Sequence, residues 1–163
     1  MTVLVAAASK HGATQEIAEA IGRVLAERGV VADVMRVEDV TDATGYEAVV
    51  LGSAVYMGNW LEPARRFVEE HGDELAARPI WLFSSGPTGE PPRPAEDQAV
   101  QIDPITAKTH AREHRLFAGK LDKSQLSFAE RAVVLAVRGA EGDFRDWDEI
   151  SAWATGIAEA LQH

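Results

Sequence analysis

The chain has 163 residues, 26 acidic and 16 basic residues that give a formal net charge of −10, and no cysteine. This length fits a single domain, residues 1–163, with a sizeable core. The acidic balance disfavours nucleic acid and anionic membranes as ligands, and the lack of cysteine excludes disulfides, thiolate catalysis and iron–sulfur clusters. The sequence has neither an apolar run of the about 18 residues that a membrane span needs nor a signal peptide, so we expect a cytoplasmic protein.

The first elements are a strand, a tight loop and a helix. Residues 2–8 are almost all apolar, as in a parallel strand that is buried on both faces. From Thr14 to Arg28 the apolar residues repeat at helical spacing. The loop between them, Ser9 to Thr14, combines a glycine with hydroxyl groups at a helix start, where backbone N–H groups lack partners. This pattern fits a site for a single phosphate and fits equally well an ordinary turn with Thr14 as the helix N-cap.

The next elements continue the alternation of strands and helices. Residues 30–37 predict an edge strand, because charged residues interrupt their apolar pattern. Residues 45–53 predict a third strand, and a helix follows for which we predict Asn59 as the N-cap. Residues 79–83 predict a fourth strand, and four prolines stiffen the segment 87–94 that comes after it.

Two apolar runs compete for the position of strand five. Residues 115–121 and residues 132–137 both have the length and composition of a strand. We favour the first, because Ser127 and Glu130 form a capping box that would open the second run as a helix. The last helix is clearer, with Asp146 as its cap and a regular apolar stripe behind it.

This alternation predicts a parallel sheet with helices on both faces. The loops after strands one, three and four carry Gly, Ser or Thr, and they meet at the carboxyl edge of the sheet. Ligands of open α/β sheets bind at that edge, where the strand order reverses. We therefore expect a binding site built from these three loops.

Individual residues of these loops have competing interpretations. Lys10 either adds charge to a phosphate site or is solvated, and His11 either donates to the phosphate or is simply exposed. Tyr56 is the better candidate for stacking on a planar ring, whereas Trp60 fits a ring contact and a core anchor equally well. Gly58 can present its backbone to a ring without a side chain in the way.

Several of these segments resemble the flavodoxins. The loop Ser9–Thr14 and its helix look like the FMN phosphate loop, and Tyr46–Ser53 resembles the third strand of the group. The segments Gly119–Asp122 and Gly142–Trp147 are similar to the branch that includes menaquinone-dependent protoporphyrinogen oxidases. The resemblance implies an α/β fold, a flavodoxin-like three-layer α/β/α sandwich with a five-stranded parallel sheet of order 2-1-3-4-5. It also implies FMN, or a related flavin, at the switch point between strands one and three.

The resemblance implies a cofactor site on the three loops, with no metal ligand and no assigned catalytic residue. Its members are Ser9, Lys10, His11, Gly12, Ala13, Thr14, Ala54, Val55, Tyr56, Met57, Gly58, Asn59, Ser84, Ser85, Gly86, Thr88 and Gly89.

The function that the resemblance implies is electron transfer through non-covalently bound FMN, to a redox partner protein or a quinone-type acceptor. The alternative is an FMN-dependent oxidoreductase of the quinone-linked protoporphyrinogen oxidase type. The loop after strand four departs from the oxidases, so their substrate does not carry over. A signalling receiver fits poorly, because the first and third strands end in Ala-Ala-Ser and Gly-Ser-Ala rather than in acidic residues. A module that only makes protein contacts is the remaining alternative.

Overall fold

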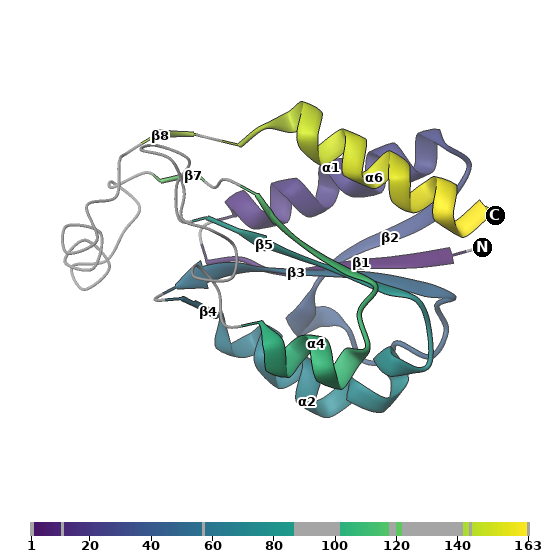
Figure 1. Cartoon of the computed structure of the whole chain (residues 1–163), viewed down its shortest axis with the longest axis vertical. Helices are drawn as coiled ribbons and strands as arrows, with labels where there is room; N and C mark the ends of the chain where they lie inside the picture. Colours follow the sequence, from purple (N-terminus) through teal and green to yellow (C-terminus); the bar gives the residue numbers. More distant parts are fainter. Residues whose placement is uncertain are drawn as a thin grey trace.

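The computed structural model describes residues 2–10, 12–56, 58–86, 102–117, 120–121, 142–143 and 145–162. These residues form an α/β/α sandwich around one parallel sheet (Figure 1). In spatial order its parallel strands are β2 (Val31–Arg36), β1 (Thr2–Ala8), β3 (Ala48–Tyr56), β5 (Ile80–Ser85) and β6 (Glu113–Phe117). Two short antiparallel pairs accompany them, formed by β4 (Asn59–Trp60) with β3 and by β7 (Lys120–Leu121) with β8 (Gly142–Asp143).

Helices cover both faces of the sheet. Figure 1 shows α1 (Ala13–Glu27) and α6 (Trp147–Gln162) on one face. The other face carries α2 (Glu62–Ala76), α4 (Asp103–Thr109) and the short 3-10 turn η1 (Val37–Asp39). None of the helices in the described part of the chain has the length and apolar character to cross a bilayer.

The continuous apolar run of β1 serves two cores at once. Val3, Val5 and Ala7 pack with α1 and α6, whereas Leu4 and Ala6 pack with α2. All of these side chains are fully buried, because successive residues of a strand point to opposite faces and each face is covered. The same reasoning identifies β1 as a central strand from its sequence.

The predicted topology is confirmed. The short strand β4 pairs with the end of β3 and is not one of the parallel strands. When the five parallel strands are numbered along the chain without β4, their order in the sheet is the expected 2-1-3-4-5. The edge position predicted for residues 30–37 is also correct, since β2 pairs with β1 alone and exposes alternate residues. Strand five is β6, which overlaps the first of the two competing runs but begins earlier, at Glu113, and ends at Phe117. The second run, residues 132–137, lies outside the described residues.

The predicted start of the helix after β3 is wrong. Asn59 does not cap that helix but belongs to β4, which turns back on β3 and pairs Tyr56 with Asn59. The helix α2 begins at Glu62, with Leu61 at its N-cap and Pro63 in its first turn. The sequence shows a polar residue before an apolar stripe, but the antiparallel pairing of β4 takes that residue out of the capping position.

Gly52 in the centre of β3 is required by the ring next to it. A Cβ at this position would lie 2.1 Å from Cζ of Phe83, which is paired with Gly52 across the two strands. We predict that Gly52→Ala lowers the free energy of unfolding by about 1–3 kcal/mol, because a core this dense absorbs an extra methyl group only with strain. Urea denaturation measures the effect.

The control is Gly156→Ala on the exposed side of α6, where nothing lies within 4 Å of the added carbon. This variant should gain about 0.5–1 kcal/mol, because alanine is the better helix former. An unchanged unfolding midpoint for Gly52→Ala would show that Phe83 can move aside freely.

Candidate functional site

Three loops meet where β1, β3 and β5 end. These strands are neighbours in the sheet, and their carboxyl ends lie on the side opposite to the two chain termini (Figure 1). Each loop contains a glycine in the left-handed region, with φ of 90° at Gly12, 81° at Gly58 and 96° at Gly86. No heavy atom lies within 4 Å of a Cβ built at Gly12 or Gly86, so both face open space. At Gly12 and Gly86 the backbone is therefore accessible at this edge.

The first loop has the geometry of an anion site. The Ser9 hydroxyl accepts a hydrogen bond from the Gly12 N–H at 2.9 Å and keeps its own hydrogen to donate. The Glu16 N–H donates to the Gly12 carbonyl at 3.0 Å, as the first hydrogen bond of α1. The N–H groups of residues 13–15 consequently have no acceptor within the helix. The helix N-cap is Gly12, so the alternative prediction of Thr14 as N-cap is wrong.

The charged residues predicted for this loop are only partly placed. Lys10 is exposed beside Gly12 at the end of the loop, and His11 lies outside the described residues. Thr14 is 2% exposed in the first turn of α1. Its side chain is thus shielded from bulk solvent at the helix start.

A buried arginine from the far end of the chain reaches the start of α1. The Nη1 atom of Arg145 donates to the Ala13 carbonyl at 3.2 Å and to Oε1 of Glu16 at 2.7 Å. Its side chain is 5% exposed, and the guanidinium group lies 4.6 Å from the centroid of the Trp147 ring. The contact joins the segment before α6 to the first turn of α1 and places a cation beside the anion site.

The second loop is a tight hairpin. Val55 pairs with Trp60 and Tyr56 with Asn59, which leaves Gly58 at its tip. Ala54 and Val55 are half-buried, Asn59 is exposed, and Met57 lies outside the described residues. Trp60 is 1% exposed, so its interpretation as a core anchor is correct. The hairpin thus places Gly58 at the edge and Trp60 beneath it.

The third loop is described only where it leaves β5. Ser84 is fully buried and Ser85 is 4% exposed. The Gly86 N–H donates to the Phe117 carbonyl at 3.0 Å, which fixes the start of the loop to β6. Thr88 and Gly89 lie outside the described residues. Because Ser84 points into the core, any contact between this residue and a ligand at the edge has to come from its backbone.

Comparisons with known proteins agree on one family. A family model described as "Flavodoxin domain" matches residues 4–148. The chain belongs to the flavodoxin-domain family.

Relatives match this flavodoxin domain over most of its length. It is 23% identical to the protein called protoporphyrinogen IX dehydrogenase [quinone] from Escherichia coli K12, over 97% of this chain and 95% of that protein. It is 27% identical to the protein of the same name from Leishmania major, over 90% of this chain and 70% of that protein.

Solved structures show the same fold. An archaeal flavodoxin superposes with a TM-score of 0.65 at 19% identity, with each chain covered completely. A short-chain flavodoxin associated with a PDU bacterial microcompartment gives a TM-score of 0.62 at 16% identity, over 99% of this chain and 97% of that one.

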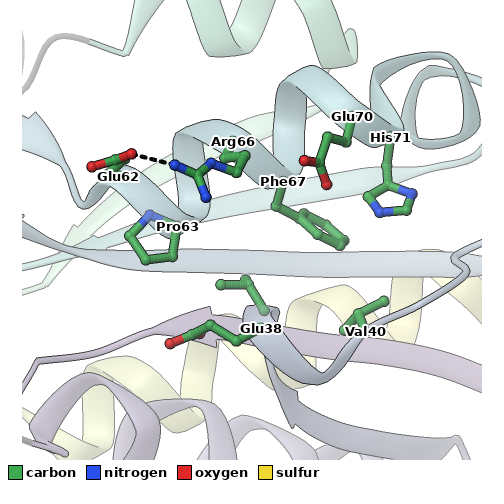
Figure 2. Close-up of a pocket in the computed structure, with 9 residues that line it drawn as sticks. Glu38, Val40, Glu62, Pro63, Arg66, Phe67, Glu70 and His71 are labelled. Carbon is green, nitrogen blue, oxygen red and sulfur yellow. Dashed lines mark hydrogen bonds and ion pairs between the residues drawn. The ribbon is translucent and has the colours of Figure 1, made fainter.

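The flavodoxin domain has a hollow between η1 and α2 (Figure 2). Its volume is about 520 Å³. The carboxylates of Glu38, Glu62 and Glu70 line it, and the guanidinium of Arg66 there is already paired with Glu62 at 2.5 Å. Such a lining repels phosphate. The hollow is therefore unsuited to a phosphorylated cofactor, whereas the start of α1 is well suited to one.

Arg145 is the residue at the functional edge that sequence reasoning missed. Its contact spans 132 positions of the chain, which no local periodicity reports. The only signal is an arginine two residues before a tryptophan and immediately before the helix cap Asp146.

We predict that Arg145→Met destabilises the domain. The methionine keeps an apolar stem against Trp147 but loses the hydrogen bonds to Ala13 and Glu16, at a cost of about 1–3 kcal/mol. The control is Arg66→Met, which breaks an exposed pair with Glu62 and should cost about 0.5 kcal/mol or less. Thermal unfolding measures the melting temperature of each variant. A melting temperature for Arg145→Met equal to that of Arg66→Met would contradict a structural role for Arg145.

Proposed function

We propose that this chain is an FMN-binding redox protein that transfers electrons through a non-covalently bound flavin. The observation that carries the proposal is the convergence of three glycine-containing loops, after β1, β3 and β5, on one edge of a flavodoxin-domain sheet. Ligands of open α/β sheets bind at this edge, at the point where the strand order reverses between β1 and β3.

The phosphate end of FMN fits the start of α1. The N–H groups of Ala13, Thr14 and Gln15, the hydrogen of the Ser9 hydroxyl and the positive end of the helix dipole all favour a dianion. The exposed Gly12 leaves room for close approach, since no atom lies within 4 Å of its missing Cβ. Lys10, His11 and the Thr14 hydroxyl complete the proposed cradle.

The ring end of FMN fits between the second and third loops. Residues 54–59 border the ring on one side, and residues 84–86 with Thr88 and Gly89 border it on the other. When bound, FMN supplies the electron-accepting chemistry, and the protein sets its orientation and potential. The net charge of −10 disfavours additional negative charge on the flavin and so lowers its reduction potential.

A second candidate function is an FMN-dependent oxidoreductase linked to a quinone. The observation in its favour is the alignment with the Escherichia coli protoporphyrinogen IX dehydrogenase [quinone] over 97% of this chain. The two candidates differ in their electron donor. An assay with protoporphyrinogen and a menaquinone analogue separates them, because only the oxidoreductase turns over with that pair.

The absorbance spectrum of the purified protein tests the cofactor. We expect a flavin spectrum, or uptake of added FMN by the colourless protein, and release of FMN on denaturation. A protein that stays colourless after incubation with FMN would contradict the proposal and favour a module that only makes protein contacts.

We predict that Thr14→Ala weakens FMN binding by about tenfold or more, because one hydrogen bond to a charged group is worth about 1.5–3 kcal/mol. Flavin fluorescence quenching measures the affinity. The control is Thr44→Ala, which removes a hydroxyl bound to Asp42 in the loop before β3, at the opposite edge of the sheet. Equal affinities for wild type and Thr14→Ala would count against the phosphate loop.

We also predict that Gly58→Val changes the separation between the two one-electron reduction potentials of the flavin. Gly58 has φ of 81° at the hairpin tip, and valine is strained there, so the neighbouring peptides must reorient. These peptides are the proposed partners of flavin N5, whose protonation changes on reduction. The control is Gly45→Val, in open space at the opposite edge. A redox titration identical to that of wild type would rule out this role of the turn.

A further inference from the structure

The Ser84 hydroxyl joins three separate elements beneath the candidate site. The Trp60 Nε1–H of β4 donates to Oγ of Ser84 at 2.7 Å, and Oγ of Ser84 lies 2.7 Å from Nε2 of His114 in β6. An indole nitrogen can only donate, so the Ser84 oxygen is the acceptor of the first bond. The Ser84 hydrogen is then available to a neutral His114 ring. The three side chains form one connected network, the Trp60–Ser84–His114 network.

This network lies directly under two of the three loops. Ser84 is the second-last residue of β5 and stands two positions before Gly86. Trp60 stands two positions after Gly58, on the strand that returns from the hairpin tip. Trp60 belongs to the core on the α2 side of the sheet, in which Leu82 and Leu116 also pack. The network therefore connects the loops after β3 and β5 from below.

The network is buried, and burial gives it structural consequences. Ser84 is 0% exposed and Trp60 is 1% exposed. A buried indole N–H or hydroxyl without a partner destabilises the fold by about 1–3 kcal/mol. The arrangement in which the Trp60 indole and the Ser84 hydroxyl bind each other is therefore strongly favoured. Polar networks of this kind select one geometry among the many that an apolar core would accept.

The geometry that is selected is the position of the hairpin. The β4 strand has only two residues, and its pairing with β3 involves Val55 and Tyr56. Two further hydrogen bonds secure its end, from the Leu61 N–H to Oγ of Ser53 at 3.0 Å and from Nε of Arg65 to the Trp60 carbonyl at 3.1 Å. These bonds anchor the hairpin to its own strand and to α2. Among these bonds of the described residues, the one from Trp60 to Ser84 reaches across to β5 and fixes the hairpin relative to that strand.

We infer that Ser84 and His114 are positioning residues that hold Trp60, and through it the turn at Gly58, at a fixed distance from the end of β5 and Gly86. This inference rests on the proposed function, because it concerns the gap that would receive the flavin ring. Ser84 itself does not reach the edge, so it acts through Trp60. Loss of the network should alter how the turn at Gly58 adapts when the flavin is reduced. It should leave the binding of the FMN phosphate at the start of α1 unaffected.

The first test needs no flavin. In the apo protein, Ser84→Ala should increase the solvent exchange of the Trp60 indole N–H by at least about tenfold, because that hydrogen loses its acceptor. The chain has four tryptophans, and Trp60→Phe identifies the relevant indole resonance by its disappearance. The control is Thr109→Val, which removes another fully buried hydroxyl, bound to the Ile105 carbonyl at 2.8 Å in α4. The control should leave the exchange rate of the Trp60 indole N–H unchanged.

The second test uses the FMN-loaded protein. Ser84→Ala and Trp60→Phe should each change the ratio of the two one-electron reduction equilibrium constants by about tenfold, with FMN affinity within a few-fold of wild type. The double variant should show the same change as either single variant, because both remove the same hydrogen bond. His114→Gln, which can still accept from Ser84, should have a smaller effect than His114→Ala.

The outcomes separate the inference from the proposed function. If the wild-type chain takes up no FMN, the proposed function fails, and the indole exchange still decides whether the network holds the hairpin. If FMN binds and Ser84→Ala resembles Thr109→Val in both exchange and potentials, the positioning role is overturned. If exchange rises while the potentials stay at wild-type values, the network is structural only and the inference is likewise overturned. Should Ser84→Ala fail to fold, Trp60→Phe supplies the same redox comparison, because it removes the bond to Ser84 and keeps an aromatic side chain at position 60.

Discussion

The burial of the sheet on both faces is the constraint on which the rest of the molecule depends. Helices α1 and α6 on one side and α2 and α4 on the other leave no open face, and β1 is buried along almost its whole length. Chemistry is then confined to the loops at the ends of the strands. The parallel order brings the carboxyl ends of β1, β3 and β5 together, so residues far apart in the chain, such as Gly12 and Gly86, share one edge.

Much of this arrangement could be predicted from the sequence, because the responsible signals are local. The uninterrupted apolar run of residues 2–8 implies a strand covered on both sides, and the charged residues of β2 imply an edge. The order of the strands follows from the flavodoxin resemblance together with the alternation of elements. The central and edge positions of these strands depend on periodicity and composition within a single element.

The features that could not be predicted depend on pairings and contacts that no hydrophobic periodicity reports, two of them between distant segments. The β4 hairpin displaces Asn59 from the helix cap, Arg145 reaches the first turn of α1, and Trp60 meets Ser84 beneath the edge. A polar residue in a loop looks the same in the sequence whether it faces a ligand or the core. The sequence pattern accordingly groups Ser84 with the ligand-facing residues, although its hydroxyl is held inside by Trp60 and His114.

The two ends of the proposed flavin site differ in how strongly they depend on side chains. The phosphate end relies on backbone N–H groups at the start of α1 and on one small residue, Ser9, so many sequences can build it. The fold itself is likewise shared with flavodoxin structures at only 16–19% identity. The ring end relies on a hairpin whose position is set by specific buried side chains. In this chain, the buried bond from Trp60 to Ser84 therefore couples the packing beneath β3 and β5 to the loops at the edge above them.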